Sequence, residues 1–533
     1  MVTLLKTSRP LLDTTLLFLL YGAILLVSAA FLLKPVNDPD FFWHLKTGEW
    51  IWQHRGLPAS DPFNFMNQEM ADGNQRFTLT AYWLTQVIFH LVHSLLGMPG
   101  IAALKFLMVL LIVAALLKLR RGDPVIHAAL VLSVLPLLTL VYTYDRPQAF
   151  SILFFATLLA ILERERTSRT VPSSWQSYLA VPLLMLLWGN MHGGHVLGQI
   201  TILMFIVLEG VKFAHPTLQP MGRDRYRRLL IVGGAGLIVS LINPNSWHAL
   251  QVALTPLPVW LHNMEYKSTV AFFRGQRLVA IFWGALALSA LAVLFTIRRP
   301  DITWIALLAG LGYQGFIHVR YVPFFMIAAL PVVGSWLSSE RFGRWVRPVL
   351  VVGAVALVAI PMKDNLPSRE RASLSLRVNE HIYPVRAADF VLANAPSGNL
   401  YNTYFWGGYL IWRLGPERKV FVDGRGLSFQ PIFKGFSIDI AFSNPTEPPP
   451  LWKRLLRQYG IGYLIIPRVD SNAGVKLDEV AKLRTALLES PEWVPVFADA
   501  ISLVFVKNAP EHRELIRKHE IPRERLLGRR PRI

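Results

Sequence analysis

The sequence has 533 residues, of which 53% are hydrophobic and 17% are charged, and its formal net charge is +20. A soluble domain is typically about 45–50% apolar and about a quarter charged, so this composition excludes an ordinary soluble protein and predicts a polytopic membrane protein. The basic residues lie in short clusters between apolar runs, which favours a role in orienting the chain in a bilayer over nucleic-acid binding. Because the sequence contains no cysteine, disulfides, thiolate catalysis and cysteine-ligated metals are excluded.

Long apolar runs predict the membrane-spanning part. Lys6 and Arg9 precede the first run, but that run is long and no small-residue cleavage site precedes Lys34, so we expect an uncleaved first span. A span needs about 20 residues, and hairpin ends shorten the visible run. The candidate spans are 14–33, 99–117, 125–143, 147–162, 174–189, 195–210, 228–243, 278–297, 302–317, 321–337 and 346–361.

A further apolar run, 79–97, contains Gln86, His90 and His93 and is ambiguous. Lys and Arg accumulate in cytoplasmic loops, so loop charge decides the matter. If 79–97 does not cross the membrane, every connection on one face is basic. We therefore predict a re-entrant or interfacial helix at 79–97, about eleven spans, a cytoplasmic N-terminus and an extracytoplasmic C-terminus. The basic residues of that face include Lys118, Arg120, Arg121, Arg164, Arg166, Lys212, Arg225, Arg228, Arg298, Arg299, Arg341 and Arg347.

The opposite face collects polar and ionisable side chains at the ends of spans. Such groups are costly beside a bilayer, and function is the default hypothesis for them. The candidates are Asp38, Asp40, His44, Arg146, Gln148, Asn190, His192, His195, His318 and Arg320.

The chain after Pro361 is charged and punctuated by Pro and Gly. "PVRAADFVLANAP" and "PLWKRLLRQYG" predict helices, the second closed by Gly460, whereas "GNLYNTYFWGGYLIW", "KVFVDGR", "GYLIIPR" and "ISLVFVKN" predict strands. The predicted fold class is mainly α. Residues 1–361, including a first outer loop at 35–98, form a polytopic helical bundle, and residues 362–533 form an extracytoplasmic α/β domain with a basic C-terminal tail.

Asp38 and Asp40 open the first outer loop, and two interpretations compete. In the first, Asp38 starts a turn, Asp40 caps a helix over 41–54, and the aromatic residues of that helix anchor it in the headgroup zone. In the second, one carboxylate removes a proton from an attacking hydroxyl, or the two share a divalent cation, Mg²⁺ or Mn²⁺.

Arg146 and Arg320 each sit at the outer end of a span, where a guanidinium can hold the phosphate of a polyprenyl lipid. The alternatives are snorkelling to headgroups or pairing with an acid such as Asp145. His192 and His195 flank a Gly-Gly turn, which favours hydrogen bonding to a phosphate or sugar about equally with a purely structural turn.

In the C-terminal part, Asp423 and Arg425 either contact an acceptor or form an internal ion pair; we favour the ion pair.

The motifs "DPDFFWHLKTGEWI", "SDPFNF", "DRPQAFS", "WGNMHGGHVLG", "NTYFWGGYLIW" and "VFVDGRG" resemble those of a poorly characterised group of bacterial membrane proteins in or near the GT-C superfamily of glycosyltransferases. The resemblance implies a polyprenyl-phosphate-linked sugar donor, transfer on the extracytoplasmic side, and a catalytic Asp in the first outer loop. That position matches Asp38 or Asp40, and we favour Asp40 as the base with Asp38 as its partner. For the second acid often present in a later loop, the sequence offers Asp145 or Glu265, so metal use is open.

The predicted function is therefore glycosyl transfer to a glycan, lipid or protein acceptor of the envelope, in the bacterial inner membrane and without nucleic acid as partner. Two alternatives remain. A flippase of lipid-linked glycans would place polar residues in mid-membrane and show related halves, whereas we find polarity at one face and no repeat. A non-catalytic assembly protein would use the same loops for docking.

Overall fold

The computed structural model describes residues 2–32, 35–67, 73–138, 145–167, 176–215, 217–255, 266–273, 279–296, 300–339, 343–365, 376–427, 429–441, 449–468 and 477–526. Contacts divide the chain into two compact units. Unit 1 comprises Met1–Lys34 and Pro99–Ser373, and unit 2 comprises Pro35–Met98 and Leu374–Ile533. The sequence assigned 35–98 to the bundle, whereas its contacts group it with the C-terminal residues.

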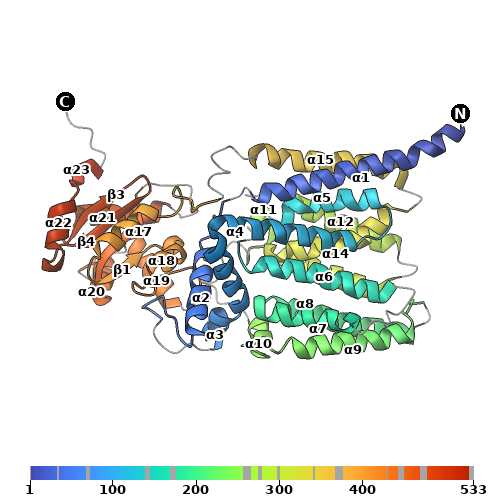
Figure 1. The fold of residues 1–533 in the computed structure, drawn as a ribbon, viewed down its shortest axis with the longest axis horizontal. Coiled ribbons are helices and arrows are strands. Elements are labelled where there is room, and N and C mark those ends of the chain that lie inside the picture. Colours follow the sequence, from blue (N-terminus) through green and yellow to red (C-terminus); the bar gives the residue numbers. More distant parts are fainter. Residues whose placement is uncertain are drawn as a thin grey trace. The chain divides into compact units, whose positions relative to one another are not determined.

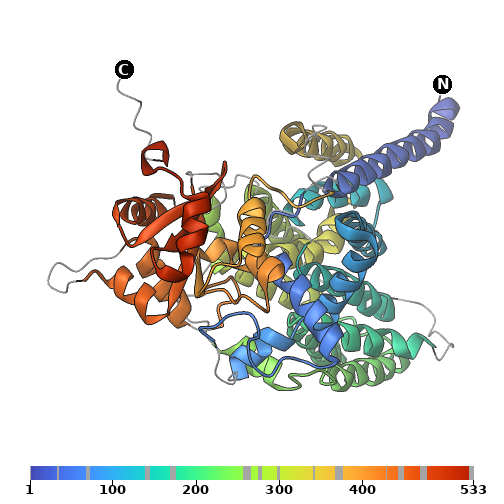
Figure 2. The ribbon, with the colours of Figure 1, turned by 60° about the vertical axis from the view of Figure 1, so that its left-hand side comes forward.

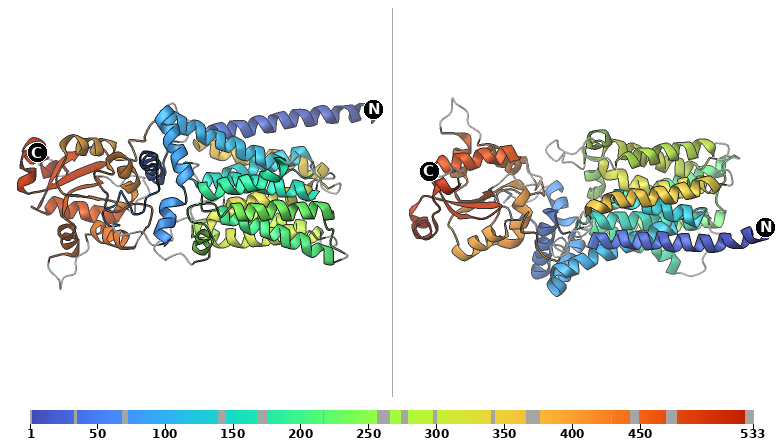
Figure 3. Two further views of the ribbon diagram at one scale, coloured as in Figure 1. Left: turned by 60° about the horizontal axis from the view of Figure 1, so that its bottom comes forward. Right: turned by 90° about the horizontal axis from the view of Figure 1, so that it is seen from above.

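Unit 1 is a bundle of apolar helices that lie side by side (Figures 1 and 3). Among its neighbouring pairs are α5 with α15, α7 with α9, and α13 with α14. The helices are α1 (Val2–Leu32), the second part of α4 (Trp83–Lys118), α5 (Pro124–Leu138), α6 (Gln148–Thr167), α7 (Gln176–Met191), α8 (His195–Val211), α9 (Arg223–Val239), α10 (His248–Leu254), α11 (Thr269–Phe273), α12 (Val279–Phe295), α13 (Ile302–Ile317), α14 (Val322–Leu337) and α15 (Gly343–Asn365), with 3₁₀ turns η1 (Lys212–Ala214) and η4 (Val319–Tyr321).

Within the described residues each predicted span overlaps one of these helices, since a backbone surrounded by apolar side chains must satisfy its own hydrogen bonds. Four stretches of the described chain are long and apolar enough to cross a membrane: Asp13–Ala30, Gly73–Lys118, His195–Ala214 and Val319–Leu337. Shorter apolar helices occupy Pro124–Leu138, Ser177–Met191, Val279–Phe295, Ile302–Ile317 and Trp345–Ala359. The protein is thus mainly helical and membrane-embedded, and the count of eleven spans stays a prediction.

The ambiguous run 79–97 is helical over most of its length and ends at a break inside α4. Gly97 has φ 62° and ψ −156°, and Pro99 follows it. Such a backbone interrupts a helix, because Gly adopts positive φ and Pro removes an amide donor. The boundary between the units falls between Met98 and Pro99, so 79–97 packs with unit 2 rather than with the bundle.

Unit 2 combines a small sheet with helices, coloured orange to red in Figure 2 apart from its N-terminal segment. The strand order is β1-β2-β4-β3; β1 pairs parallel to β2, and the other two pairings are antiparallel. Helices cover a core that includes Leu464, Leu483 and Phe505. The elements are α2 (Asp40–His54), α3 (Gly73–Thr80), α17 (Val385–Asn394), β1 (Asn399–Asn402), η5 (Tyr404–Trp406), α18 (Gly407–Leu414), α19 (Phe429–Asp439), α20 (Leu451–Gln458), β2 (Ile461–Pro467), α21 (Leu477–Glu489), β3 (Trp493–Ala498), β4 (Ser502–Lys507), η6 (Pro510–His512), α22 (Arg513–His519) and α23 (Arg523–Leu526).

Two strand predictions in unit 2 are wrong. In "GNLYNTYFWGGYLIW" only Asn399–Asn402 is a strand, and the second half forms α18. "KVFVDGR" is an extended loop with an isolated bridge between Val420 and Asn64. The reason is a side chain that takes the place of a neighbouring strand: the Asn402 amide donates to the Val422 carbonyl at 2.8 Å and accepts from the Phe421 amide at 2.9 Å.

Candidate functional site

The predicted site residues divide between the two units. Asp38, Asp40 and His44 belong to unit 2. Convergence of all ten residues on one cavity therefore stays a prediction. The remaining seven belong to unit 1: Arg146, Gln148, Asn190, His192, His195, His318 and Arg320.

Of the two acids in the first loop, Asp38 has the turn-forming role expected of it and Asp40 does not cap the helix. Asp38 Oδ1 accepts the backbone N–H of Asp40 at 3.0 Å, as in an Asx turn, so Asp38 organises the start of α2. Asp40 is the first residue of α2, and its Oδ1 accepts the indole N–H of Trp43 at 3.0 Å. The prediction that Asp40 caps the helix is therefore wrong. Its half-buried carboxylate is oriented by a side chain instead.

The aromatic residues at the start of α2, Phe41, Phe42 and Trp43, are buried inside unit 2, whereas Trp52 near its end is exposed. Phe42 is fully buried and meets the rings of Tyr383 and Tyr409 edge-on, with centroids 4.7 and 5.2 Å away. Edge-on contacts suit aromatic quadrupoles and add to the burial of apolar area. The predicted anchoring role thus does not apply to Phe42, and packing in the protein interior fixes α2.

His44 is buried and bonded within the protein. Its Nδ1 lies 3.1 Å from the Gln86 side-chain amide. One helical turn further, an added Cβ at Gly48 would meet the Gln86 carbonyl oxygen at 1.9 Å, so α2 and α4 approach closely here. His44 therefore links the first-loop helix to the run 79–97, whereas the sequence placed it among substrate-binding residues.

An ionic cluster joins the first loop to the C-terminal part of unit 2. The Arg425 guanidinium donates two hydrogen bonds to Asp61 and two to Asp423, each at 2.8 Å. Asn64 donates to Asp423 Oδ2 at 3.1 Å, the oxygen that also accepts from Arg425 Nη2. All four side chains are buried. We call Asp61, Asn64, Asp423 and Arg425 the clasp.

The predicted ion pair between Asp423 and Arg425 is confirmed by this geometry, whereas Asp61 and Asn64 were missed as its partners. The motif "SDPFNF" that contains both residues was the available signal, but a sequence does not show which distant Arg a buried Asp meets.

The pKa values of the two clasp carboxylates are shifted in opposite directions. Burial raises the pKa of Asp61, and the charge of Arg425 offsets this rise only in part. Burial acts on Asp423 as well, but the charge of Arg425 and the hydrogen bonds from Arg425 and Asn64 outweigh it, so the pKa of Asp423 lies below its ordinary value. Asp423 is thus the firmly ionised member of the pair.

Three glycines bring the motifs of unit 2 into contact. An added Cβ at Gly424 would lie 2.3 Å from Asp40 Oδ1, and one at Gly408 would lie 2.2 Å from the Pro39 carbonyl oxygen. At Gly407 it would lie 2.2 Å from the Val422 carbonyl oxygen. At Gly407 and Gly408 the neighbouring atoms are backbone, so these positions require glycine, whereas a side chain at Gly424 would have to displace the Asp40 carboxylate. Three motifs far apart in the sequence therefore meet next to Asp40.

In unit 1 the predicted histidine turn is built around His192. Ser151 Oγ lies 2.6 Å from His192 Nδ1 and accepts the Trp188 indole N–H at 2.7 Å, and the Gly194 amide also donates to Nδ1. With two donors directed at Nδ1, this nitrogen is the acceptor, and neutral imidazole then carries its proton on Nε2. His192 is thus preorganised as a hydrogen-bond donor through Nε2.

The two predicted arginines of unit 1 act on His192 electrostatically. Burial, then the charges of Arg320 and Arg146, lower the pKa of this imidazole well below its ordinary value. Arg320 also lies over the Tyr266 ring at 4.6 Å and donates to the Tyr266 hydroxyl. His318 Nδ1 contacts the Tyr266 carbonyl oxygen at 2.9 Å. Arg146, His192 and Arg320 therefore share one region of unit 1.

The other predicted residues of unit 1 have different surroundings. Asn190 donates to the carbonyls of Leu186 and Ile242, at 2.9 and 2.8 Å, and has a structural role. By contrast, Gln148 Oε1 and His195 Nε2 are buried and meet no hydrogen-bonding partner among the described residues. Buried polar atoms of this kind indicate a site for water or a ligand.

The metal expectation has little support in the described residues. They contain no group of three or more His, Asp or Glu side chains that could hold a metal ion. Asp145 lies 3.7 Å from Lys105, and Glu265 lies outside the described residues. No step below depends on a cation.

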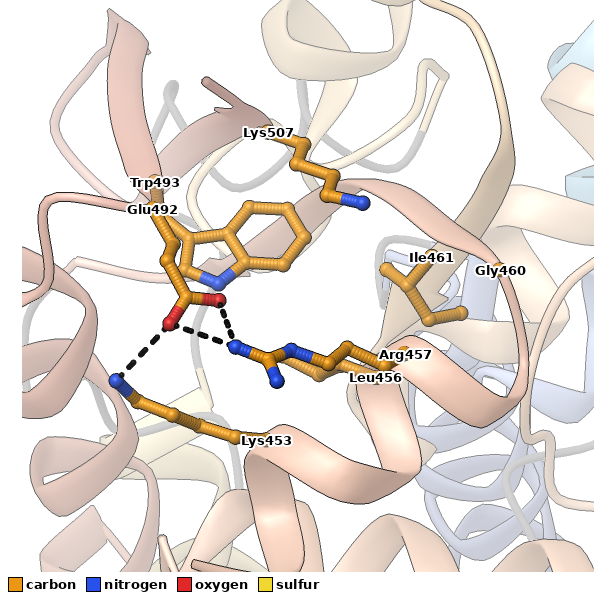
Figure 4. Close-up of a pocket in the computed structure, with 8 residues that line it drawn as sticks. All are labelled: Lys453, Leu456, Arg457, Gly460, Ile461, Glu492, Trp493 and Lys507. Carbon is orange, nitrogen blue, oxygen red and sulfur yellow. Dashed lines mark hydrogen bonds and ion pairs between the residues drawn. The ribbon is translucent and has the colours of Figure 1, made fainter. Parts of the chain in front are cut away.

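A small pocket in unit 2 lies between α20 and the sheet (Figure 4). Glu492 holds Lys453 Nζ at 3.3 Å and Arg457 Nη2 at 3.1 Å, and the Lys507 side chain stands on the other side of the pocket. Burial raises the pKa of Glu492, but these two cations outweigh it and lower the pKa overall. None of the ten predicted site residues lines this pocket.

Known structures settle the fold that this geometry belongs to. The chain is similar to arabinofuranosyltransferase AftD from Mycobacteria, with a TM-score of 0.57 at 17% identity over 92% of this chain. It is also similar to the Archaeoglobus fulgidus oligosaccharyltransferase, with a TM-score of 0.56 at 11% identity over 94% of this chain and 75% of that one. The chain has the GT-C fold.

A third GT-C structure is ArnT from Cupriavidus metallidurans bound to undecaprenyl phosphate, with a TM-score of 0.51 at 14% identity, covering 92% of this chain and 98% of that one. The chain spans only 40% of the length of AftD. No family model matches the chain, and no curated protein matches it.

Proposed function

We propose that this protein transfers a sugar from a polyprenyl-phosphate-linked donor to an acceptor of the bacterial envelope, on the extracytoplasmic face of the plasma membrane. The GT-C fold supports the reaction class. The ArnT structure contains undecaprenyl phosphate, and an Archaeoglobus fulgidus oligosaccharyltransferase structure contains dolichol-phosphate with an inhibitory peptide. These ligands support a lipid phosphate as the donor's carrier here.

One observation carries the proposal: Asp40 lies where three separate motifs of unit 2 meet, since Gly424 abuts its carboxylate and Gly408 abuts the preceding Pro39. Asp40 is the base that removes a proton from the acceptor hydroxyl, and Trp43 holds its Oδ1 so that the carboxylate has one orientation. Asp38 fixes the backbone from which Asp40 projects.

The donor phosphate is held by Arg146 and Arg320, with His192 donating from Nε2. Guanidinium groups stay charged and bind phosphate oxygens through paired N–H groups. His192 stays neutral because burial and the two arginines lower its pKa, so it binds phosphate as a fixed N–H donor rather than as a counter-charge. The unpartnered polar atoms of Gln148 and His195 suit further contacts to phosphate or sugar.

The topology follows from loop charge. The N-terminus and the basic connections lie in the cytoplasm, and residues 362–533 lie outside it. A glycan, a lipid and a protein are all compatible acceptors.

Full-length protein, purified in detergent or nanodiscs, should be incubated with a panel of polyprenyl-phosphate sugars while donor consumption is followed. Asp40→Asn should reduce transfer by about 10²- to 10⁴-fold, the usual contribution of a general base, while the protein stays folded and inserted. Asp389→Asn is the matched control, because Asp389 is an exposed carboxylate of the same unit that pairs with Arg413. Normal transfer by Asp40→Asn would remove Asp40 from the mechanism.

A further inference from the structure

We propose that the clasp positions the Asp40 carboxylate, and that it acts through Gly424. Asp61, Asp423 and Arg425 are then positioning residues for the reaction proposed above. The catalytic half of this inference rests on that proposed function, whereas the mechanical half stands on contacts within unit 2.

First, the turn that carries Gly424 is held by hydrogen bonds of the Asp423 side chain. Asp423 Oδ1 accepts both the backbone N–H of Arg425, at 3.0 Å, and its Nε–H, at 2.8 Å. The side chain of Asp423 therefore closes a ring across Gly424, and the backbone of 423–425 is held from both ends.

The second step is the attachment of this turn to the first loop. Arg425 makes two hydrogen bonds to Asp61, and the Val420 amide donates to the Phe63 carbonyl at 2.9 Å. Asp61 in turn accepts the Phe63 amide at 3.0 Å. The segment around Asp61 and the turn around Gly424 are thus one hydrogen-bonded body, although more than 350 residues separate them in sequence.

The third step is the contact with Asp40. A Cβ at position 424 would reach Asp40 Oδ1 at 2.3 Å, Cγ at 3.4 Å and Oδ2 at 3.9 Å. The backbone of the turn is therefore in steric contact with one oxygen of the carboxylate, the same oxygen that accepts the hydrogen bond from Trp43. The Trp43 indole binds Oδ1 and the Gly424 turn limits how far this oxygen moves, so contacts within unit 2 set the orientation of the carboxylate.

Displacement of the Gly424 turn should reduce kcat more than it weakens donor binding. A displacement of about 1 Å of a reacting group typically costs about a hundredfold in rate. We expect Gly424→Ala to lower kcat by about tenfold to a hundredfold while KM for the donor changes little. The pH profile of kcat should shift as well, because the carboxylate changes its surroundings. A defect that only unfolds part of the protein would scale the amount of active enzyme and leave both KM and the pH profile unchanged.

A double-mutant cycle on thermal unfolding tests the contact without substrate. Gly424→Ala should lower the unfolding midpoint in the wild type, and the decrease should largely disappear in an Asp40→Ala background, where the clashing oxygens are absent. Gly56→Ala is the control, since an added Cβ there meets its nearest neighbour at 3.8 Å and should shift neither background.

Equal shifts in both backgrounds would overturn the positioning contact, as would a Gly424→Ala enzyme whose kcat falls only with the folded fraction. The two proposals fail separately. If the wild type consumes no donor, the proposed function is lost, while the thermal cycle still decides whether the turn at Gly424 contacts Asp40.

Discussion

Each unit contains a buried ionic cluster, and the two clusters differ in the ratio of cations to carboxylates. In unit 1, Lys212 Nζ lies 2.6 Å from Glu209 and 2.9 Å from Asp301, and Arg166 Nη1 lies 2.7 Å from Asp301. Arg166 also pairs with Glu163 at 3.1 Å, and Arg121 pairs with the same carboxylate, so three cations face three acids. In unit 2, by contrast, two carboxylates share the single guanidinium of Arg425.

The balance of charge distinguishes a cluster that only stabilises the fold from one that lies at the candidate active site. Burying charges costs free energy, which is recovered only when partners and hydrogen bonds match the charges. The cluster of unit 1 ties α6 and α8 to the start of α13 with cations and acids in similar number, although the sequence suggested only an orienting role for its basic residues. The clasp retains surplus negative charge in a buried place, and it does so next to Asp40.

The largest expected effect comes from removing the one cation of the clasp. Arg425→Ala leaves two buried carboxylates without a counter-charge and should reduce the free energy of unfolding by about 3–5 kcal/mol. Lys212→Ala should cost less, because Arg166 still pairs with Asp301 and Thr303 still donates to Glu209 at 2.8 Å. Thermal unfolding of both variants in the same detergent makes the comparison; equal losses would show that balance does not distinguish the clusters.

Ser151→Ala is expected to have an intermediate effect. It removes a donor to His192 Nδ1 and the acceptor of the Trp188 indole, both buried. Leaving such a group unsatisfied costs about 1–3 kcal/mol. With the tautomer of His192 less firmly set, KM for the donor should rise while kcat changes little. Ser133→Ala is the control, because Ser133 donates only to the Ala129 carbonyl of its own helix; an unchanged KM in Ser151→Ala would argue against a donor-binding role for His192.

The pH dependence of unit 2 should follow the opposite shifts of its two acids. The pKa of Asp61 is raised in the folded protein, so its contribution to stability increases as the pH falls through that value. The pKa of Asp423 is lowered, so its contribution is present above the ordinary value of 3.8 and is lost as the pH falls below it. We expect the thermal unfolding midpoint to be maintained in mild acid and to decrease once the pH is below about 3.8. In Asp61→Asn the gain in mild acid should vanish; its persistence would assign it to another group.

The smallest effect is expected at the pocket lined by Glu492. Arg457 is 57% exposed at its side chain, and solvent screens such pairs, so Glu492→Gln should change the free energy of unfolding by about 0–1 kcal/mol. The change should shrink further in high salt. A loss as large as that of Arg425→Ala would mean that this pocket carries more than a surface ion pair.

Local pattern was sufficient for much of the secondary structure. The apolar runs are helices, "GYLIIPR" and "ISLVFVKN" contain β2 and β4, and the helices predicted in "PVRAADFVLANAP" and "PLWKRLLRQYG" are confirmed as α17 and α20. Gly460 ends the latter region with φ +59°. The misassigned segments are "WGGYLIW" and "KVFVDGR", whose conformations depend on distant partners.

The sequence by itself determined a membrane-embedded, mainly helical protein with a GT-C resemblance, acids after the first span and a pair formed by Asp423 and Arg425, because hydrophobic periodicity and short-range pairing are written into neighbouring residues. Only the tertiary structure decided that Asp38 rather than Asp40 organises the start of α2, that Asp61 completes the clasp, and that Gly424 abuts Asp40. Those contacts join residues hundreds of positions apart. Their free energy depends on burial and on which partner arrives, and neither can be read from one segment alone.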